Sequence, residues 1–234
     1  MNLRRKKYCP SIHTCIFLRT TFVLVLLLGG QKAFAQDSDY GIWGIYVGTG
    51  TIDEKWSIFV EAQYRDHKII GDFNSLVFRL AGQYNVVKNV NLSLGYSHFV
   101  TTPEINGEKV TRHEYRPYQQ VFVRSKFGVV YLNHRYRFEQ RILQDDFRLR
   151  FRYFLQTNII LNKPQMERGA IYISGYGEIF LNFESPVYDR TRVFVGLGYA
   201  ISSSVRMEVG NLTQIFETFS ENQLNIFLFH NFNL

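Results

Sequence analysis

A strict two-residue alternation of apolar and polar side chains constrains this fold more than any other feature of the sequence. In the segment 56–64, Trp56, Ile58 and Val60 alternate mostly with polar or charged residues such as Glu61 and Gln63. Side chains point to opposite faces along a β-strand, so such a segment has one apolar and one polar face. The same pattern recurs in the segments 76–84, 90–99, 113–124, 129–141, 146–160, 168–181, 191–202, 205–216 and 223–234. The sequence therefore predicts an all-β protein of about ten strands.

The connections between these segments indicate an antiparallel up-and-down barrel. Short connections at 86–89, 125–128 and 202–204 alternate with longer ones, such as those at 66–74 and 100–112. Short turns at one end and long loops at the other are typical of transmembrane β-barrels. Residues 40–48 also alternate and resemble a further strand. Because single-chain bacterial barrels usually have an even number of strands, a barrel of twelve strands stays open as an alternative.

The apolar face distinguishes a membrane barrel from a water-soluble one. On the ten predicted strands, no position of that face is Asp, Glu, Lys or Arg, and Tyr64, Tyr84 and Tyr115 lie near strand ends. Lipid excludes charge from the outer wall of a barrel, and aromatic side chains collect at both membrane interfaces. A soluble sandwich could also have an uncharged core, but it would not need ten such long strands with tyrosines at their ends. We therefore predict a transmembrane barrel.

The first 35 residues have the pattern of a cleaved signal peptide. A basic stretch at 4–7 precedes the apolar run at 22–28, and Ala33-Phe34-Ala35 is a typical cleavage signal. Seven apolar residues are too few for a membrane-spanning helix, which needs about twenty. This organisation predicts a signal peptide at 1–35, an N-terminal segment at 36–54 and a barrel at 55–234. The segment 36–54 is expected to be an extra strand, a periplasmic segment or a plug.

The leader also accounts for most of the net positive charge. The whole chain carries 27 Lys and Arg against 20 Asp and Glu, and six of the basic residues lie in the leader, which has no acidic residue. Both cysteines, Cys9 and Cys15, lie there too, so the remainder has neither a disulfide framework nor a thiolate metal site. The remainder is close to neutral, which argues against a nucleic-acid-binding domain. We expect a monomer in the outer membrane of a Gram-negative bacterium. Its expected partners are membrane lipid, lipopolysaccharide and the barrel-assembly machinery.

The polar face of the strands is rich in arginine and is expected to line the lumen. Adjacent antiparallel strands would bring these side chains side by side, where arginines outnumber glutamates and need compensation from carboxylates, anions or water. We predict a lumen charge network formed by Glu61, Arg65, Arg79, Glu114, Arg116, Arg124, Arg135, Arg137, Glu139, Arg141, Arg148, Arg150, Arg152, Glu178, Arg192, Arg206 and Glu208.

Several motifs resemble one family of outer-membrane barrels. They are a tryptophan near the start of the mature chain, Glu61-x-x-x-Arg65, a tyrosine-rich hairpin, Glu114-Tyr115-Arg116, and the arginine runs 135–141 and 148–153. Together they resemble the family catalogued as domain of unknown function 2490, over nearly all of the mature chain. The C-terminal strand, with alternating apolar residues up to Leu234, is similar to the signal by which such barrels are recognised for assembly. The resemblance implies an outer-membrane barrel and brings no activity, ligand or cofactor.

No catalytic motif stands out in the sequence. In outer-membrane lipases and lipid A deacylases a His-x-Ser pair places base and nucleophile on one face of a strand, but none of the six histidines here has Ser two residues later. Two function classes therefore remain. One is a structural barrel or a narrow anion-preferring pore. The other is a lipid-modifying or lipid-binding enzyme at the rim, using Asp66, His67, Asp72, Glu104, Glu108 and His113.

Overall fold

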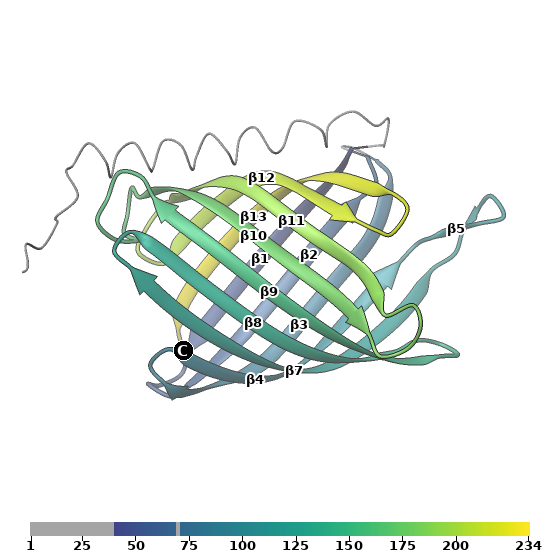
Figure 1. Ribbon diagram of the computed structural model, residues 1–234, viewed down its shortest axis with the longest axis horizontal. Coiled ribbons are helices and arrows are strands. Elements are labelled where there is room, and N and C mark those ends of the chain that lie inside the picture. The colour runs from purple at the N-terminus through teal and green to yellow at the C-terminus, as the bar shows by residue number, and fades with distance from the viewer. Residues whose placement is uncertain (1–39, 69–70) are drawn as a thin grey trace, which may run out of the picture. The chain divides into compact units, whose positions relative to one another are not determined.

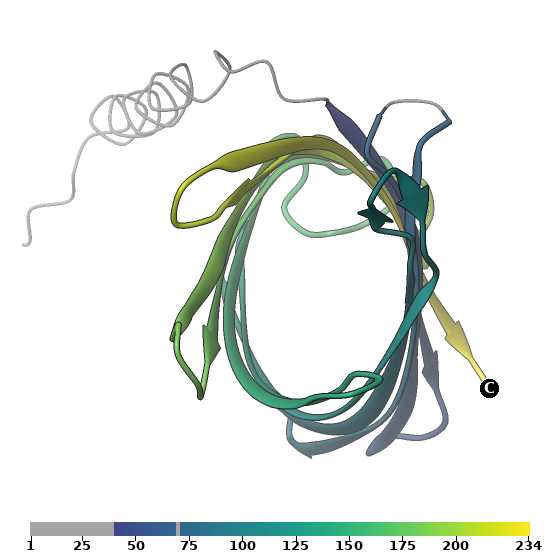
Figure 2. The same cartoon turned by 90° about the vertical axis from the view of Figure 1, so that its right-hand side faces the viewer.

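The computed structural model describes residues 40–68 and 71–234, and these residues form a closed β-barrel (Figures 1 and 2). Eleven strands make up its wall: β1 (Gly41–Thr51), β2 (Trp56–Asp66), β3 (Phe73–Val87), β4 (Val90–Thr101), β7 (Arg112–Phe127), β8 (Val130–Ile142), β9 (Phe147–Ile160), β10 (Ile171–Asn182), β11 (Tyr188–Ala200), β12 (Val205–Ile215) and β13 (Ser220–Asn233). The predicted all-β barrel is confirmed. The predicted signal peptide and residues 36–39 lie outside the described residues.

The barrel is a meander in which each strand pairs with its neighbours in sequence, and it closes between β1 and β13. All neighbouring wall strands are antiparallel except this pair, which is parallel, with Gly41 opposite Gln223 and Gly50 opposite Phe232. The parallel seam follows from the odd number of strands, since an up-and-down chain of eleven strands has its first and last strands running in the same direction. The end of β1 therefore lies beside the C-terminus, where the Leu234 amide donates to the Thr51 carbonyl at 2.9 Å.

The two ends of the barrel carry connections of different character. At the end where β1 begins, β4 and β7 are joined by a long connection that contains a small hairpin of β5 (Glu104–Ile105) and β6 (Glu108–Lys109). This hairpin projects beyond the wall in Figure 1. At the opposite end, the β9–β10 connection turns inward over the mouth (Figure 2). Its Met166 amide donates to the Tyr131 hydroxyl at 3.1 Å, and Met166 packs against a buried cluster that includes Ile160 and Tyr172.

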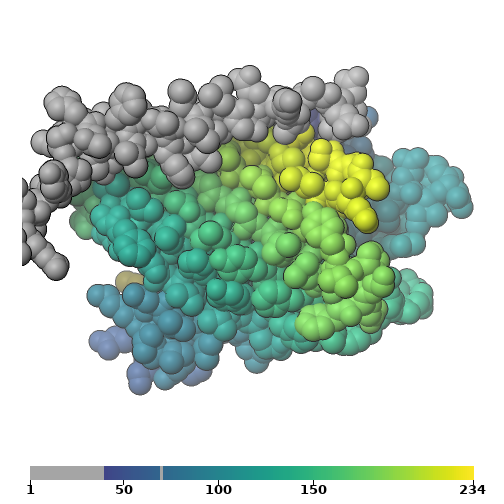
Figure 3. Space-filling view, in the orientation of Figure 1, coloured from purple at the N-terminus to yellow at the C-terminus, as the bar shows by residue number. Residues whose placement is uncertain are grey.

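The outward face of the wall is apolar, as the alternation requires. Its exposed side chains include Phe78, Leu80, Leu94 and Leu197. Figure 3 shows one side of the outer surface, coloured by position in the chain. Asn211 and Thr213 of β12 are exceptions that form local hydrogen bonds. The Tyr40 hydroxyl donates to Asn211 and the Thr213 hydroxyl donates to Asn222, each at 2.7 Å. In the described ranges 40–68 and 71–234, no helix is long and apolar enough to cross a membrane.

Part of the interior is apolar and relies on aromatic rings that lie over glycines. Trp43, Phe194 and Leu212 form a buried cluster at the β1, β11 and β12 side of the barrel. Tyr118 of β7 lies over Gly95 of the neighbouring strand β4. From β8, the neighbour on the other side of β7, the Arg137 guanidinium lies 4.3 Å from the centroid of the Tyr118 ring. A Cβ atom at position 95 would overlap that ring, so the glycine is required by close approach rather than by backbone conformation.

Gly95→Ala is expected to destabilise the barrel by about 1–3 kcal/mol, because the added methyl group overpacks against a fully buried ring. The matched control is Gly82→Ala on the neighbouring strand, where an added Cβ has no atom within 4 Å. Denaturant unfolding of the refolded barrel, followed by the heat-induced shift in gel mobility, measures both. Equal losses for the two variants would show that the Tyr118–Gly95 contact is not tightly packed.

Candidate functional site

Glu139 is the centre of the charged part of the interior. It lies on β8 directly opposite Arg150 of β9, and its carboxylate accepts from Arg150 at 2.7 Å and from Arg152 at 2.6 Å. The Arg137 guanidinium lies 3.5 Å from the same carboxylate. Glu139 and Arg137 are each only 1% exposed. One carboxylate thus compensates three arginines on two adjacent strands, in a region closed to solvent.

The ion pairs continue from Glu139 to both sides across four strands. On one side Arg152 also donates to Glu178 of β10 at 2.7 Å, and Glu178 accepts from Arg135 at 2.5 Å. On the other side Arg150 donates to Asp189 of β11 at 2.8 Å. The resulting chain crosses β8, β9, β10 and β11, so each of these strands is tied to the others through buried charge as well as through backbone hydrogen bonds.

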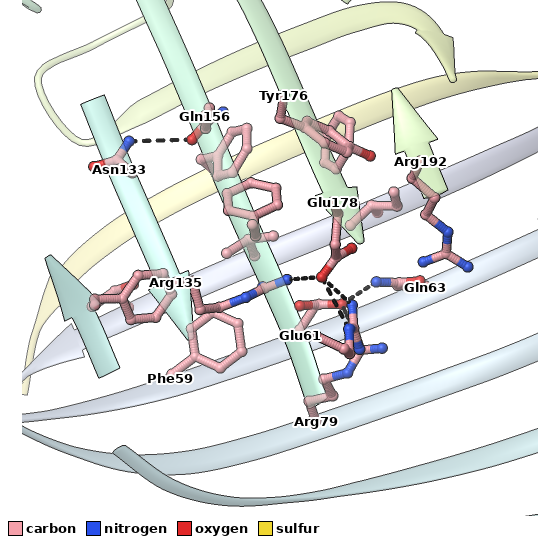
Figure 4. A pocket seen from close by; sticks show the side chains of 18 of the residues that line it. Phe59, Glu61, Gln63, Arg79, Asn133, Arg135, Gln156, Tyr176, Glu178 and Arg192 are labelled. Atoms are coloured by element: carbon pink, nitrogen blue, oxygen red, sulfur yellow. Dashed lines mark hydrogen bonds and ion pairs between the residues drawn. The ribbon is translucent and has the colours of Figure 1, made fainter. Parts of the chain in front are cut away.

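Two further groups of ion pairs involve the predicted residues of β2, β3, β7 and β8. Glu114 accepts from Arg116 at 2.6 Å and from Arg141 at 2.5 Å, and both arginines approach it in bidentate geometry. Glu61 pairs with Arg79 of the neighbouring strand, as the dashed lines in Figure 4 show. Charge-assisted contacts of this kind are the stronger hydrogen bonds in proteins.

The remaining predicted residues have no ion pair with one another. Arg65 donates to Gln63, and Arg192 donates to Gln214 at 2.8 Å. Glu208 accepts from the Tyr172 hydroxyl at 3.0 Å and from Ser174 at 2.9 Å. The others are placed by their surroundings: Arg124 near the Phe122 ring, Arg206 over the Phe229 ring, and Arg148 at the rim. Arg148 is 51% exposed and pairs with Asp146 at 2.5 Å, which places it outside the buried network.

Sequence reasoning missed several interior residues. Asp189 and Arg190 form part of the network, but the segment 182–190 reads as a loop because two polar residues and a proline precede the alternation. Trp43 lies under the Arg65 guanidinium, 4.0 Å from the ring centroid. In the sequence, Trp43 alternates with Ile45 and Val47, and this alternation indicates that the three side chains share one face of a strand. Gln120, by contrast, lies on the polar face that the alternation predicts to line the lumen, and it accepts from the Arg137 Nε at 2.8 Å.

The loop residues predicted for a rim site come together only in part, since the His67 backbone amide donates to the Asp72 carbonyl at 2.9 Å. Lys109 of the β6 strand donates to Asp72 at 2.7 Å, and this hydrogen bond holds the pKa of the Asp72 carboxyl below its usual range. His67 contacts Asn74, whereas His113 stacks on His98 with ring centroids 5.3 Å apart. Within the part of the chain that the structure describes, no three His, Cys, Asp or Glu side chains are arranged to hold a metal ion.

A cavity of about 250 Å³ lies inside the barrel beside this network. Figure 4 shows its side chains: the Glu61–Arg79 and Arg135–Glu178 pairs on one side, Asn133 with Gln156 on another, and Arg192 near Gln63. Amide groups, guanidinium groups and aromatic rings line it together. The arrangement can hold a polar or anionic group, but it presents no nucleophile paired with a base.

These features define a closed β-barrel whose interior contains buried ion pairs and a cavity. A family model described as "Protein of unknown function (DUF2490)" matches residues 40–225. The chain belongs to this family, as the arginine motifs indicated. The match covers strands β1 to β12 and the first part of β13, so it includes every strand of the ion-pair network. No curated protein and no solved structure matches the chain.

Glu139→Gln is expected to destabilise the barrel by about 3–5 kcal/mol, because it removes the charge that compensates three buried arginines. Glu208→Gln is the matched control. Glu208 is equally buried but accepts only from two hydroxyl groups, so an amide should cost no more than about 1 kcal/mol. Urea unfolding of both variants in the same detergent tests the difference. Similar losses would mean that charge compensation at Glu139 contributes little.

Proposed function

We propose that the protein is a structural barrel of the outer membrane. Its lumen is closed, so it does not act as an open channel. The observation that carries this proposal is the near-complete burial of large side chains inside the barrel. Arg137, Glu139, Tyr118 and Phe180 come from three strands, and each is at most 2% exposed. Barrels of about eight strands have interiors just wide enough for side chains to fill, and in this barrel of eleven strands long arginine and aromatic side chains occupy part of the wider interior.

The outer wall supports insertion into a lipid bilayer. Leu94, at the middle of β4, is 66% exposed although it is apolar, and its outward neighbours are also uncharged. Towards the strand ends, aromatic side chains pair on the same face, as Trp56 does with Tyr84 at 4.9 Å between ring centroids. An apolar band between aromatic girdles is the arrangement that lipid requires of a barrel. Membrane lipid and lipopolysaccharide would then be the partners of this wall, and we retain the monomer as the expected state.

A structural barrel is favoured over an anion-preferring pore and over a rim enzyme. A pore needs a continuous hydrated path past the arginines, whereas the Glu139 network places buried ion pairs inside the barrel. A rim enzyme needs a base beside a nucleophile, and the rim histidines contact Asn74 or each other. The carboxylate chain through β8 to β11 instead supports a role in holding a rigid, sealed wall.

Purified full-length protein is expected to insert into planar bilayers without conducting ions, because buried side chains close the lumen. The control is the double variant Tyr118→Ser/Arg137→Ser, which removes two large buried side chains and leaves Glu139 paired with Arg150 and Arg152. It should produce ion-conducting events under the same conditions. Steady conductance from the unmodified protein would refute the closed lumen.

Leu94→Arg should cost about 2–4 kcal/mol in bilayers if its side chain lies near the midplane. Val87→Arg is the comparison, since Val87 is also exposed but ends β3 beside a turn, where the same change should cost about 0–1 kcal/mol. Equilibrium unfolding in lipid vesicles measures both variants. A cost that does not depend on position would argue against a wall embedded in lipid.

A further inference from the structure

The interior cavity has an excess of positive charge that the ion-pair network does not remove. Seven arginines and two glutamates are among the residues that line it, which gives a formal charge of +5. The two glutamates are already engaged, Glu61 with Arg79 and Glu178 with Arg135 and Arg152. Lys and Asp do not occur among the lining residues. Four of these five charges belong to the other four arginines, and the fifth is shared with Glu139, which accepts from Arg152 at 2.6 Å.

These four arginines are Arg65, Arg124, Arg192 and Arg206. Among residues 40–68 and 71–234, none of them has a carboxylate within 4.0 Å. Arg65 is buried and Arg192 and Arg206 are half-buried, whereas Arg124 is exposed. An uncompensated charge in a protein interior is costly, so three of these arginines carry a cost that stability alone does not explain.

Aromatic rings hold these guanidinium groups without neutralising them. The guanidinium carbons of Arg65 and Arg192 lie 4.0 Å and 5.1 Å from the centroid of the Trp43 ring, and that of Arg206 lies 4.3 Å from the centroid of Phe229. A cation–π contact fixes the plane of the cation and leaves hydrogen-bond donors at its edge. Both rings also line the cavity. Pre-organised donors and aromatic surface thus border the same space.

We propose that this cavity binds a small organic anion that has an aromatic body and a carboxylate or phosphate group. The arginines supply charge-assisted hydrogen bonds to the anionic group, for which the guanidinium fork is well suited. Trp43, Phe154 and Phe229 supply surface for the apolar body. A volume of about 250 Å³ matches one ring with a charged substituent, since an apolar cavity of about 150 Å³ is enough for benzene.

The test is calorimetric titration of the full-length protein in detergent with benzoate and with phenylphosphate. Benzyl alcohol, which lacks the charge, and inorganic phosphate, which lacks the ring, are titrated in parallel. We expect saturable binding of the two aromatic anions, weaker binding of phosphate and no binding of the alcohol. Bound ligand should also raise the unfolding temperature, because it stabilises only the folded barrel.

Arg192→Gln is the variant that tests the site. It should weaken binding of both aromatic anions on the order of ten- to hundredfold, as expected for the loss of a hydrogen bond to a charged group. Arg148→Gln is the matched control, because Arg148 lies at the rim outside the cavity. This variant should bind both aromatic anions with the affinity of the unmodified protein. Arg206→Gln serves as the second variant if Arg192→Gln does not refold.

Absence of saturable binding, or equal affinity in the Arg192→Gln and control proteins, would overturn the proposal. Equal binding of inorganic phosphate and phenylphosphate would also overturn it, because the aromatic part of the ligand would then contribute nothing. Conductance of the same preparation is measured separately. A conducting barrel would contradict the closed lumen while leaving the titration result to decide the anion site.

Discussion

Compensation of arginine charge inside a closed wall is the constraint on which the rest of this structure depends. Glu139 lies among three guanidinium groups, and Glu178 and Asp189 extend the contact to neighbouring strands. Because each carboxylate serves more than one arginine, the loss of one leaves several charges without a partner. The network therefore acts as a unit that joins β8 to β11. Its side chains are buried inside the barrel, and this burial is the basis on which we propose a closed lumen.

The interior divides into two regions with different chemistry. Around Glu139 the arginines are paired and buried, whereas around Trp43 and Phe229 they are backed by aromatic rings and lack carboxylates. The first region accounts for rigidity. The second region lowers the stability of the folded barrel unless an anion binds there. Functional sites in proteins commonly have such a cost in stability. A sealed barrel and a ligand cavity are thus compatible in one lumen, provided that they occupy different parts of it.

The alternation of the sequence predicts which residues face inward, because strands have a period of two that few interactions can override. It thus placed Glu139, Arg150 and Arg152 on the face that the structure turns inward. It could not predict which side chains meet across the lumen. Arg135 and Glu178 lie on strands that are not neighbours, and their contact depends on the tilt and stagger of the closed barrel. Asp189 was missed because the β11 strand begins inside a segment with the composition of a loop. The alternation also indicates β1, but the sequence leaves its place in the barrel open because counting it gives eleven strands, whereas single-chain bacterial barrels usually have an even number.

The parallel seam has a consequence for the order in which the barrel assembles. Every other pairing joins strands adjacent in the meander and can form as a hairpin, but the seam joins Gly41 to Gln223, about 180 residues apart. Bringing these two strands together has a large entropic cost, which falls only when the intervening strands are already aligned. Until then β1 and β13 present two unpaired edges, which invite pairing with other chains. Because the seam pairs the first strand with the last, we expect it to close after the other strand pairings have formed.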